Sequence, residues 1–255
     1  MAVVDGGDNP LYQQIANDLR AAIRDRELAP GDQVPTEMDL AQRYGVSRNT
    51  ARMALNALAH EGLITAGRAR AGRLVRRRER MNWTHRVERG ARGTRHLTGL
   101  DDFVDQTLAQ GRTPEQTIEV SIVSASEYIA ERLEVPPGEN LVVRRRLRSV
   151  DGQPSSISES YYLFELAHGT PLLDPQVFSG SATAVLAELG HVQVRYVDEI
   201  TTRMPDPLEA QRLDIGQGVP VLAHVRTGYT DSRPIRLSLT ILPGDRHKLR
   251  YELPE

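Results

Sequence analysis

The sequence predicts a mixed α/β protein of the α+β kind, with a helical amino-terminal domain and a carboxy-terminal domain built on an antiparallel sheet. Three observations support this class. Apolar residues recur at helical spacing near the amino terminus, alternating strand patterns separated by tight turns fill the second half, and 255 residues that are 39% hydrophobic suffice for two cores. We expect two domains, residues 1–75 and 97–255, joined by an arginine-rich linker over residues 76–96.

The net charge of −2 conceals an uneven distribution of charged residues. Residues 1–96 carry 17 arginines against 11 acidic residues, whereas the rest of the chain carries 15 basic residues against 23 acidic ones. Residues 67–95 alone hold 11 arginines and two acidic residues. Such a run attracts polyanions such as nucleic acid, although a solvated, flexible linker has the same composition.

Several classes of protein are disfavoured by composition. The chain has no cysteine, so disulfides and thiolate metal sites are excluded. No apolar run approaches the roughly 20 residues of a membrane-spanning helix, and no secretory signal pattern is visible, so we expect a cytoplasmic protein without a membrane partner. The seven histidines show neither metal-ligand spacing nor a catalytic order. We therefore expect no enzyme activity, no catalytic residue, no metal and no cofactor.

The amino-terminal domain is expected to contain three helices. The first begins after Pro10, which favours the first helical position, and ends before the turn at residues 29–32. The second is short and begins at Thr36, where Asp39 three residues later completes a pattern like a capping box. Gly45 then provides a sharp corner before the third helix.

The third helix has two different faces. Ser47 is a natural N-cap, and the apolar residues at i, i+3, i+4 and i+7 must face inward: Ala51, Ala54, Leu55 and Leu58. The opposite stripe is polar: Arg48, Asn49, Arg52 and Asn56. Two helices joined by a tight turn form a helix-turn-helix, whose second helix reads base edges in the major groove. An arginine side chain can donate two hydrogen bonds to guanine, and an asparagine side chain can form the equivalent pair with adenine. The backbone N–H groups at a helix N-terminus can bind a phosphate.

A β-hairpin is expected to follow the third helix. Residues 63–65 and 73–75 are short β-prone runs on either side of a loop rich in glycine and arginine. Such a hairpin is a wing, and its arginines can reach phosphates or the minor groove. The helix-turn-helix and the wing, in this order, together predict a DNA-binding domain.

This part of the chain resembles the GntR-type winged-helix transcription regulators. The resemblance lies in PLYQQIANDLRAAI, in LAPGDQVPTEMDLAQRYGVSRNTARMALNALAHEGLI and in the wing through RAGRLV. It implies operator contacts from Ser47, Arg48, Arg52 and the wing. The candidate DNA-binding residues are Thr36, Ser47, Arg48, Asn49, Thr50, Arg52, Gly67, Arg68 and Arg70.

Two departures from the family pattern affect the expected operator. Met38 stands where the family usually has an arginine, and the wing reads Arg70-Ala71-Gly72 where the family usually has a basic residue between two glycines. The operator sequence is therefore not transferred from relatives. An alternative role for Arg48 and Arg52 is surface solubility or ion pairing with Glu37 and Asp39.

The second half contains an internal repeat with a constant offset. Eight positions recur without a gap: Ala130, Arg132, Leu133, Gly138, Arg146, Asp151, Pro154 and Ser158 as Ala210, Arg212, Leu213, Gly218, Arg226, Asp231, Pro234 and Ser238. Each copy reads as a helix followed by a hairpin, and a strand precedes each copy. An isolated hairpin is marginal, so both should join one antiparallel sheet whose face is covered by helices, with a ligand cleft where the halves meet.

This half resembles the UTRA ligand-sensing domain, which defines the HutC subfamily of GntR regulators and has a chorismate-lyase-like fold. The resemblance lies in LEVPPGENLVVRRRLRSVDGQP, FSGSATAVLAELG and ILPGDRHKLRYEL. It implies that Arg146 and Arg148 bind an anionic effector and that Ser179 and Ser181 offer hydroxyls at a helix start. Two other effector positions depart from the pattern: Ser158 replaces a glutamate and Arg236 replaces an acid. A hexosamine phosphate is therefore not the expected effector.

The arginines of this strand also have a plainer interpretation. Alternating arginines on an exposed strand are often only solvated, and a repeat-preserved arginine such as Arg146 can be kept to pair with an acid in the sheet. We expect a homodimeric, sequence-specific regulator, a repressor that a small-molecule effector releases from double-stranded operator DNA. The alternative is a ligand-independent protein of plasmid maintenance or partition.

Overall fold

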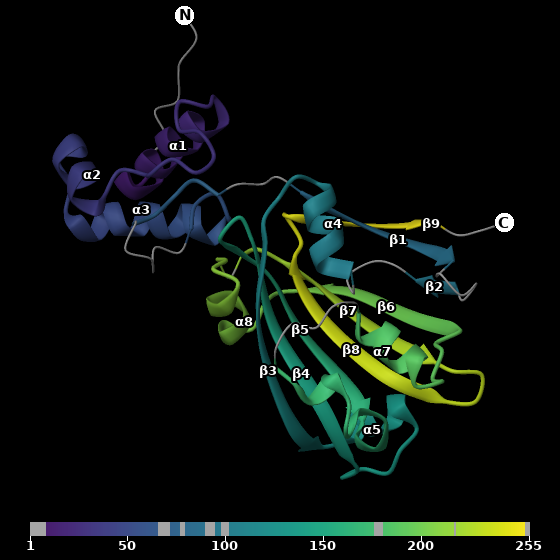
Figure 1. Cartoon of the computed structure of the whole chain (residues 1–255). Coiled ribbons are helices and arrows are strands. Elements are labelled where there is room, and N and C mark those ends of the chain that lie inside the picture. The colour runs from purple at the N-terminus through teal and green to yellow at the C-terminus, as the bar shows by residue number, and fades with distance from the viewer. Residues whose placement is uncertain are drawn as a thin grey trace, which may run out of the picture. The chain divides into compact units, whose positions relative to one another are not determined.

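The computed structural model describes residues 9–65, 72–76, 80–89, 95–97, 102–175, 181–216 and 218–252. The chain divides into two compact units (Figure 1): Met1–Glu79 with Met204–Val219, and Arg80–Arg203 with Pro220–Glu255. None of the helices in the described ranges is long and apolar enough to span a membrane.

The first unit is built on three helices: α1 (Leu11–Arg24), α2 (Glu37–Tyr44) and α3 (Arg48–His60). Thr36 caps α2 in a reciprocal capping box with Asp39, and Ser47 caps α3 by accepting a hydrogen bond from the backbone N–H of Thr50. Gly45 has a positive φ of 65°, which an L side chain adopts only at a cost, so the corner between α2 and α3 favours glycine. The apolar faces of the three helices meet in one core: Ile15, Ala16, Leu19, Leu40, Ala51, Ala54, Leu55 and Leu58.

The two arms of the predicted wing are paired. Ile64 forms an antiparallel β-bridge with Val75. Leu74 forms a second antiparallel β-bridge with Gln33, which comes from the segment before α2. The backbone N–H of Thr65 donates to the Leu74 carbonyl over 2.9 Å. The helix-turn-helix and the base of the wing are thus present, while the wing residues Gly67, Arg68 and Arg70 lie outside the described residues.

The segment Met204–Val219 also belongs to the first unit. It contains the short helix α8 (Pro207–Arg212), which begins with a capping box between Asp206 and Glu209. Two glycines pack closely against the end of α3: a Cβ on Gly216 would lie 1.9 Å from the Ala59 carbonyl oxygen. The internal repeat predicted that the helix of its second copy would cover the sheet, whereas this segment groups with the three-helix unit.

The second unit contains one six-stranded antiparallel sheet in the order β3-β4-β5-β8-β7-β6. Its strands are β3 (Pro114–Ser124), β4 (Asn140–Val150), β5 (Gln153–Leu163), β6 (Arg195–Arg203), β7 (Val221–Tyr229) and β8 (Pro234–Pro243). The hairpins β4–β5 and β7–β8 are the two copies of the repeat, and they join through β5 and β8 (Figure 1). Ser158 pairs with Thr240 and Ser160 with Ser238, so the junction relates the copies by an approximate two-fold axis.

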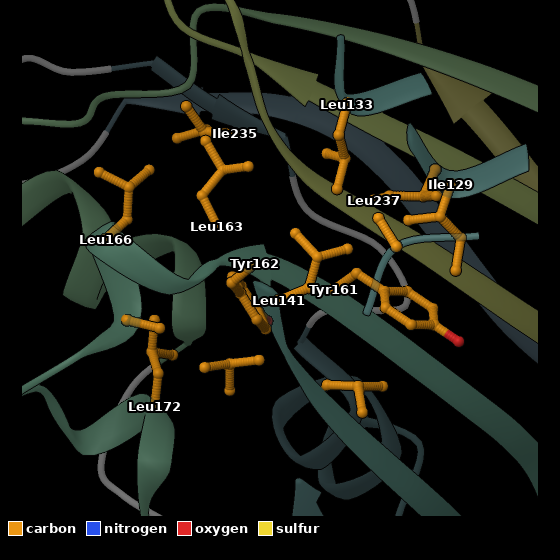
Figure 2. Close-up of a cluster of buried hydrophobic side chains, with 14 of the residues drawn as sticks. Ile129, Leu133, Leu141, Tyr161, Tyr162, Leu163, Leu166, Leu172, Ile235 and Leu237 are labelled. Carbon is orange, nitrogen blue, oxygen red and sulfur yellow. The ribbon is translucent and has the colours of Figure 1, made fainter. Parts of the chain in front are cut away.

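The sheet has one apolar face and one polar face, because directly paired residues share a face and successive residues alternate. The helix α5 (Glu127–Leu133) packs on the apolar face against β8. Figure 2 shows this cluster, to which α5 contributes Ile129 and Leu133 and the strands contribute Leu141, Tyr161, Leu163, Ile235 and Leu237. The sequence therefore predicted the joined hairpins and a covering helix correctly.

The polar face carries shorter elements. The helix α6 (Phe164–Ala167) and the 3-10 helix η2 (Pro171–Leu173) follow β5, and η2 contacts both β4 and α7 (Ala182–Glu188). A second sheet, of order β2-β1-β9, is formed by β1 (Met81–Arg89), β2 (Arg95–Leu97) and β9 (His247–Glu252). The helix α4 (Phe103–Ala109) lies close to it, since Phe103 stacks on Trp83 with ring centroids 5.8 Å apart.

The strand β1 corrects the expectation of a linker over residues 76–96. Its register with β9 is parallel, and its residues alternate between buried Met81, Trp83 and His85 and the more exposed Asn82 and Thr84. Trp83 Nε1 donates to His247 Nδ1 over 2.7 Å, and burial lowers the pKa of His247 to about 3, so this imidazole is neutral. The arginine content hid a strand that a period of two would have revealed.

Candidate functional site

The polar stripe of α3 is exposed to solvent. Ser47, Arg48, Asn49 and Arg52 are exposed and Thr50 is half-buried. Arg52 donates from Nη2 to the Asn49 side-chain oxygen over 2.5 Å. Within the described ranges, neither Arg48 nor Arg52 forms an ion pair, so pairing with Glu37 or Asp39 does not account for them.

Residues near the start of α2 and at the base of the wing were also considered as DNA contacts. Thr36 is exposed and its hydroxyl is engaged in the α2 capping box with Asp39, while Met38 is 62% exposed. Arg73, at the base of the wing, donates to the Asn56 side-chain oxygen over 2.6 Å. The wing base is therefore tied to the polar side of α3, although Asn56 was predicted only as part of the reading stripe.

The polar face of the six-stranded sheet brings together most of the predicted effector residues. The register places Arg146 opposite Ser158 and Ser158 opposite Thr240. Two residues away along each strand, a second line of paired residues crosses the sheet: Arg144, Ser160, Ser238 and Arg226. Arg148 and Arg236 lie on the same face by alternation. Five arginines and a line of hydroxyls thus occupy one side of the sheet, while Arg145 lies on the other side and pairs with Glu159 at 3.0 Å.

Three of these arginines contact the elements that cover the polar face. Arg144 is 1% exposed and donates to the carbonyl oxygens of Leu172 and Asp174, over 2.8 and 2.5 Å, so it holds η2 on the sheet. The guanidinium of Arg148 lies 4.9 Å from the centre of the Phe103 ring, and Arg236 donates to the Thr183 hydroxyl on α7. These contacts anchor the elements that cover the polar face.

The candidate serines are placed differently from one another. Ser158 is buried and its hydroxyl lies 3.2 Å from that of Thr240. Ser181 caps α7 by accepting from the Ala184 N–H, and α7 also carries Thr183, the partner of Arg236. Ser179 lies outside the described residues.

Arg226 belongs to a buried ion-pair network. It donates from Nε and Nη2 to both carboxylate oxygens of Asp198, over 2.7 and 2.8 Å, and its Nη2 lies 2.7 Å from Nδ1 of His85. His224 lies 3.1 Å from the same carboxylate. Burial alone would raise the pKa of Asp198, but the hydrogen bonds from Arg226 and His224 outweigh it and hold that pKa well below its usual range.

Arg146 lacks the partner that its repeat counterpart has. In the second copy Arg226 is paired with Asp198 on the neighbouring strand β6, but in the first copy Arg146 is paired with Ile118 on β3. Ile118 and Asp198 occupy equivalent positions of the repeat, because the offset between them equals that between the two arginines. Within the described part of the chain, Arg146 donates to the Ser160 hydroxyl over 3.1 Å and forms no ion pair.

Several residues of this face were not predicted from the sequence. Asp198, Ser160 and Thr240 belong to it only because strands distant in sequence pair with one another. The sequence did contain one signal for Asp198. The constant offset that aligns Arg146 with Arg226 also aligns Ile118 with Asp198, so the two copies differ at this position. Nothing in the sequence indicated that Arg144 would hold η2 on the sheet.

The fold and these two surfaces define a DNA-binding regulator that also carries a separate ligand-sensing domain. The model of bacterial regulatory proteins of the gntR family matches residues 11–73, and the UTRA domain model matches residues 109–248. The chain belongs to the GntR family, in its HutC-like part with a UTRA domain. It is a helix-turn-helix transcriptional regulator that binds operator DNA and a small-molecule effector, and its family is one of regulators, not of enzymes.

Relatives of known name and structure agree with this assignment. A helix-turn-helix regulator of Rhizobium meliloti is 33% identical over 95% of this chain and 94% of its own length. The mannosyl-D-glycerate transport/metabolism system repressor MngR of Escherichia coli is 28% identical over 95% of both chains. A crystal structure of a GntR-family regulator aligns over 97% of this chain and 99% of its own, with a TM-score of 0.59 and 25% identity. No comparison supports a partition protein.

Proposed function

We propose that this regulator represses transcription from its operator and that an anionic small molecule releases it. The printed names of two relatives support repression: MngR of Escherichia coli and NagR of Bacillus subtilis, the latter 27% identical over 93% of this chain and 92% of its own length. MngR is named for a mannosyl-D-glycerate system, and glycerate is a carboxylate. The effector site that we propose includes Arg146, Arg148, Ser158, Ser179, Ser181 and Arg236.

An anionic effector is supported by the difference between Arg146, which is paired with Ile118, and Arg226, which is paired with Asp198. A guanidinium next to an aliphatic side chain gains no compensation from its neighbouring strand, whereas its counterpart is neutralised by Asp198. Desolvating an unpaired charge is costly, so an anionic ligand that pairs with Arg146 gains binding free energy there. The hydroxyl of Ser160 is already within hydrogen-bond distance of Arg146.

Release from the operator requires only a modest coupling between the two sites. An effector that prefers one conformation of the protein shifts the population toward it, and a coupling of about 1–3 kcal/mol changes operator affinity about 5- to 150-fold. We further propose a homodimer, because helix-turn-helix proteins commonly read two half-sites about one helical turn apart. Since its operator lies on bacterial DNA, the regulator acts in the cytoplasm.

The DNA-binding stripe that we propose comprises Thr36, Ser47, Arg48, Asn49, Thr50 and Arg52, together with the wing residues Gly67, Arg68 and Arg70. Replacing Arg52 with alanine is expected to weaken specific operator binding about 5- to 150-fold, because one bidentate contact with a base discriminates by about 1–3 kcal/mol. Gel-shift titrations with operator and random duplexes measure this change.

A matched control is Arg24→Ala, since Arg24 is an exposed arginine at the end of α1 in the same unit and contacts Asp25, the residue that follows this helix. We expect this variant to bind operator like the wild type. If both variants lose affinity equally for operator and random duplexes, Arg52 contributes only charge and the proposed reading stripe is wrong.

The proposed function as a whole is tested with the DNA upstream of the protein's own gene. A retarded complex should form at physiological ionic strength, and it should dissociate when an effector from a panel of phosphorylated and carboxylated metabolites is added. A complex that withstands every member of the panel, and also a total extract of small metabolites, contradicts release by an anionic effector.

A further inference from the structure

Both asparagines of the polar stripe on α3 accept a hydrogen bond from an arginine. Asn49 and Asn56 are exposed and lie on the same side of the helix, because residues at i and i+7 share a face. Arg52 Nη2 donates to Asn49 Oδ1 over 2.5 Å, and Arg73 Nη2 donates to Asn56 Oδ1 over 2.6 Å. Within the described ranges, neither side-chain amide has another hydrogen-bond partner.

These contacts change what the two amides can do at a DNA surface. An asparagine that reads adenine uses both ends of its amide, donating to a ring nitrogen and accepting from the amino group of the base. In Asn49 and Asn56 the accepting oxygen is already engaged by a charged donor, and such hydrogen bonds are roughly twice as strong as neutral ones. The residue types alone suggested base reading, whereas the contacts assign both amides to arginines.

The contact with Asn49 leaves Arg52 able to bind a base. A guanidinium has several N–H donors in a fixed fork, so a single hydrogen bond to an amide leaves others for guanine. Arg52 is exposed and forms no ion pair in the described ranges. Immobilising a long, exposed side chain on binding lowers affinity about 2- to 12-fold, and an amide that already holds the side chain reduces this loss.

Asn56 holds an arginine that comes from the wing strand. The backbone there is fixed on both sides, since the Val34 N–H donates to the Arg73 carbonyl and the Leu74 N–H donates to the Thr65 hydroxyl. The side chain of Arg73 then reaches Asn56 on α3. Arg73 forms no ion pair among the described residues, so it adds positive charge beside the reading stripe, where backbone phosphates are the expected contacts.

We propose that Asn49 and Asn56 are positioning residues of the DNA-binding surface. Asn49 holds Arg52 for contact with bases, and Asn56 holds Arg73 beside the phosphates of the backbone. Neither amide reads adenine itself. This inference rests on the proposed reading stripe and divides the roles within it.

The test for Asn49 uses a duplex that the wild type selects from a pool of random sequences. Asn49→Ala is expected to weaken binding to this duplex about 2- to 12-fold, because Arg52 loses its support. In an Arg52→Ala background the same substitution should have no effect, since no arginine remains to be held. Asn49→Asp keeps the accepting oxygen, so its preference for the selected duplex over random duplexes should equal that of the wild type.

Asn56→Ala should lose affinity in a different way. Because Arg73 lies beside phosphates, the loss is expected to be equal on selected and random duplexes and to be absent in an Arg73→Ala background. The slope of log affinity against log salt concentration should become shallower by up to about 1. The control is Asn17→Ala, which removes the same kind of contact, from Arg20, on α1 and outside the stripe. This control should bind both duplexes like the wild type.

Additive losses overturn the inference. If Asn49→Ala weakens binding equally with and without Arg52, the amide contacts DNA directly. The same conclusion follows if 7-deazaadenine, which lacks the accepting ring nitrogen, weakens binding by the wild type but not by Asn49→Ala. A wild type that selects no preferred sequence contradicts the proposed reading stripe. A selected duplex that requires Arg52, but on which Asn49→Ala is additive or without effect, contradicts only this inference.

Discussion

Replacing Arg146 with methionine is expected to weaken the binding of an anionic ligand about 10- to 150-fold and to leave operator affinity without ligand unchanged. Hydrogen bonds to charged groups contribute about 1.5–3 kcal/mol each, and Arg146 is paired with Ile118 where Arg226 has Asp198. Thermal-shift titration with inorganic phosphate and with the identified effector measures the loss.

Arg145→Met is the matched control for this experiment. Arg145 is the next residue of the same strand, so its removal changes the net charge equally, but it lies on the opposite face and pairs with Glu159 and Ser121. The control is expected to bind the ligand like the wild type. Equal losses in the two variants would show that ligand binding depends on the total charge of β4 and would exclude a specific site at Arg146.

Replacing Asp198 with alanine is expected to destabilise the second unit by about 3–5 kcal/mol, because it leaves the buried guanidinium of Arg226 without its carboxylate. Urea unfolding at neutral pH, followed by tryptophan fluorescence of the buried Trp83, measures the change. The control is Glu199→Ala, the next residue, whose exposed pair with Arg132 at 3.3 Å should contribute less than about 1 kcal/mol.

The lowered pKa of Asp198 predicts how the free energy of unfolding varies with pH. Because the folded-state pKa of Asp198 is held below its usual range, the unfolded chain binds this proton more readily than the folded chain does. The contribution of Asp198 is therefore full above the ordinary aspartate pKa of about 3.9 and is lost as the pH falls below it. The wild type should lose more stability than Asp198→Asn between about pH 5 and pH 2, and parallel pH profiles would contradict the assignment.

The DNA-binding half was largely predictable because its signals are local. A capping residue, a corner glycine and an apolar spacing of three and four residues specify the three helices, and the structure places Thr36, Gly45 and Ser47 in those roles. The sensing half was predictable to the extent that the repeat is visible. Its hairpins and their junction agree with the structure, since a copied pattern implies a copied supersecondary unit.

Strand β1 shows where local reasoning failed. Six of the residues from 76 to 89 are arginines, which suggested a solvated linker, yet Trp83 and His85, which lie among them in the sequence, are fully buried. Their burial depends on a parallel pairing with β9, the last strand in the described part of the chain. No periodicity within a short window can report a partner so distant.

The amino-acid sequence alone was enough to identify the family, the order of the helices, the exposed stripe of α3 and the duplicated hairpins, because each of these is encoded within a few residues or by direct self-similarity. The separate roles of the sensing-domain arginines depended on the folded sheet. Arg145 faces Glu159, Arg226 faces Asp198 and Arg146 faces Ile118, and each of these neighbours comes from another strand. The chemistry of a charged side chain in a sheet is set by the residue across from it, and only the register of the folded strands selects that residue.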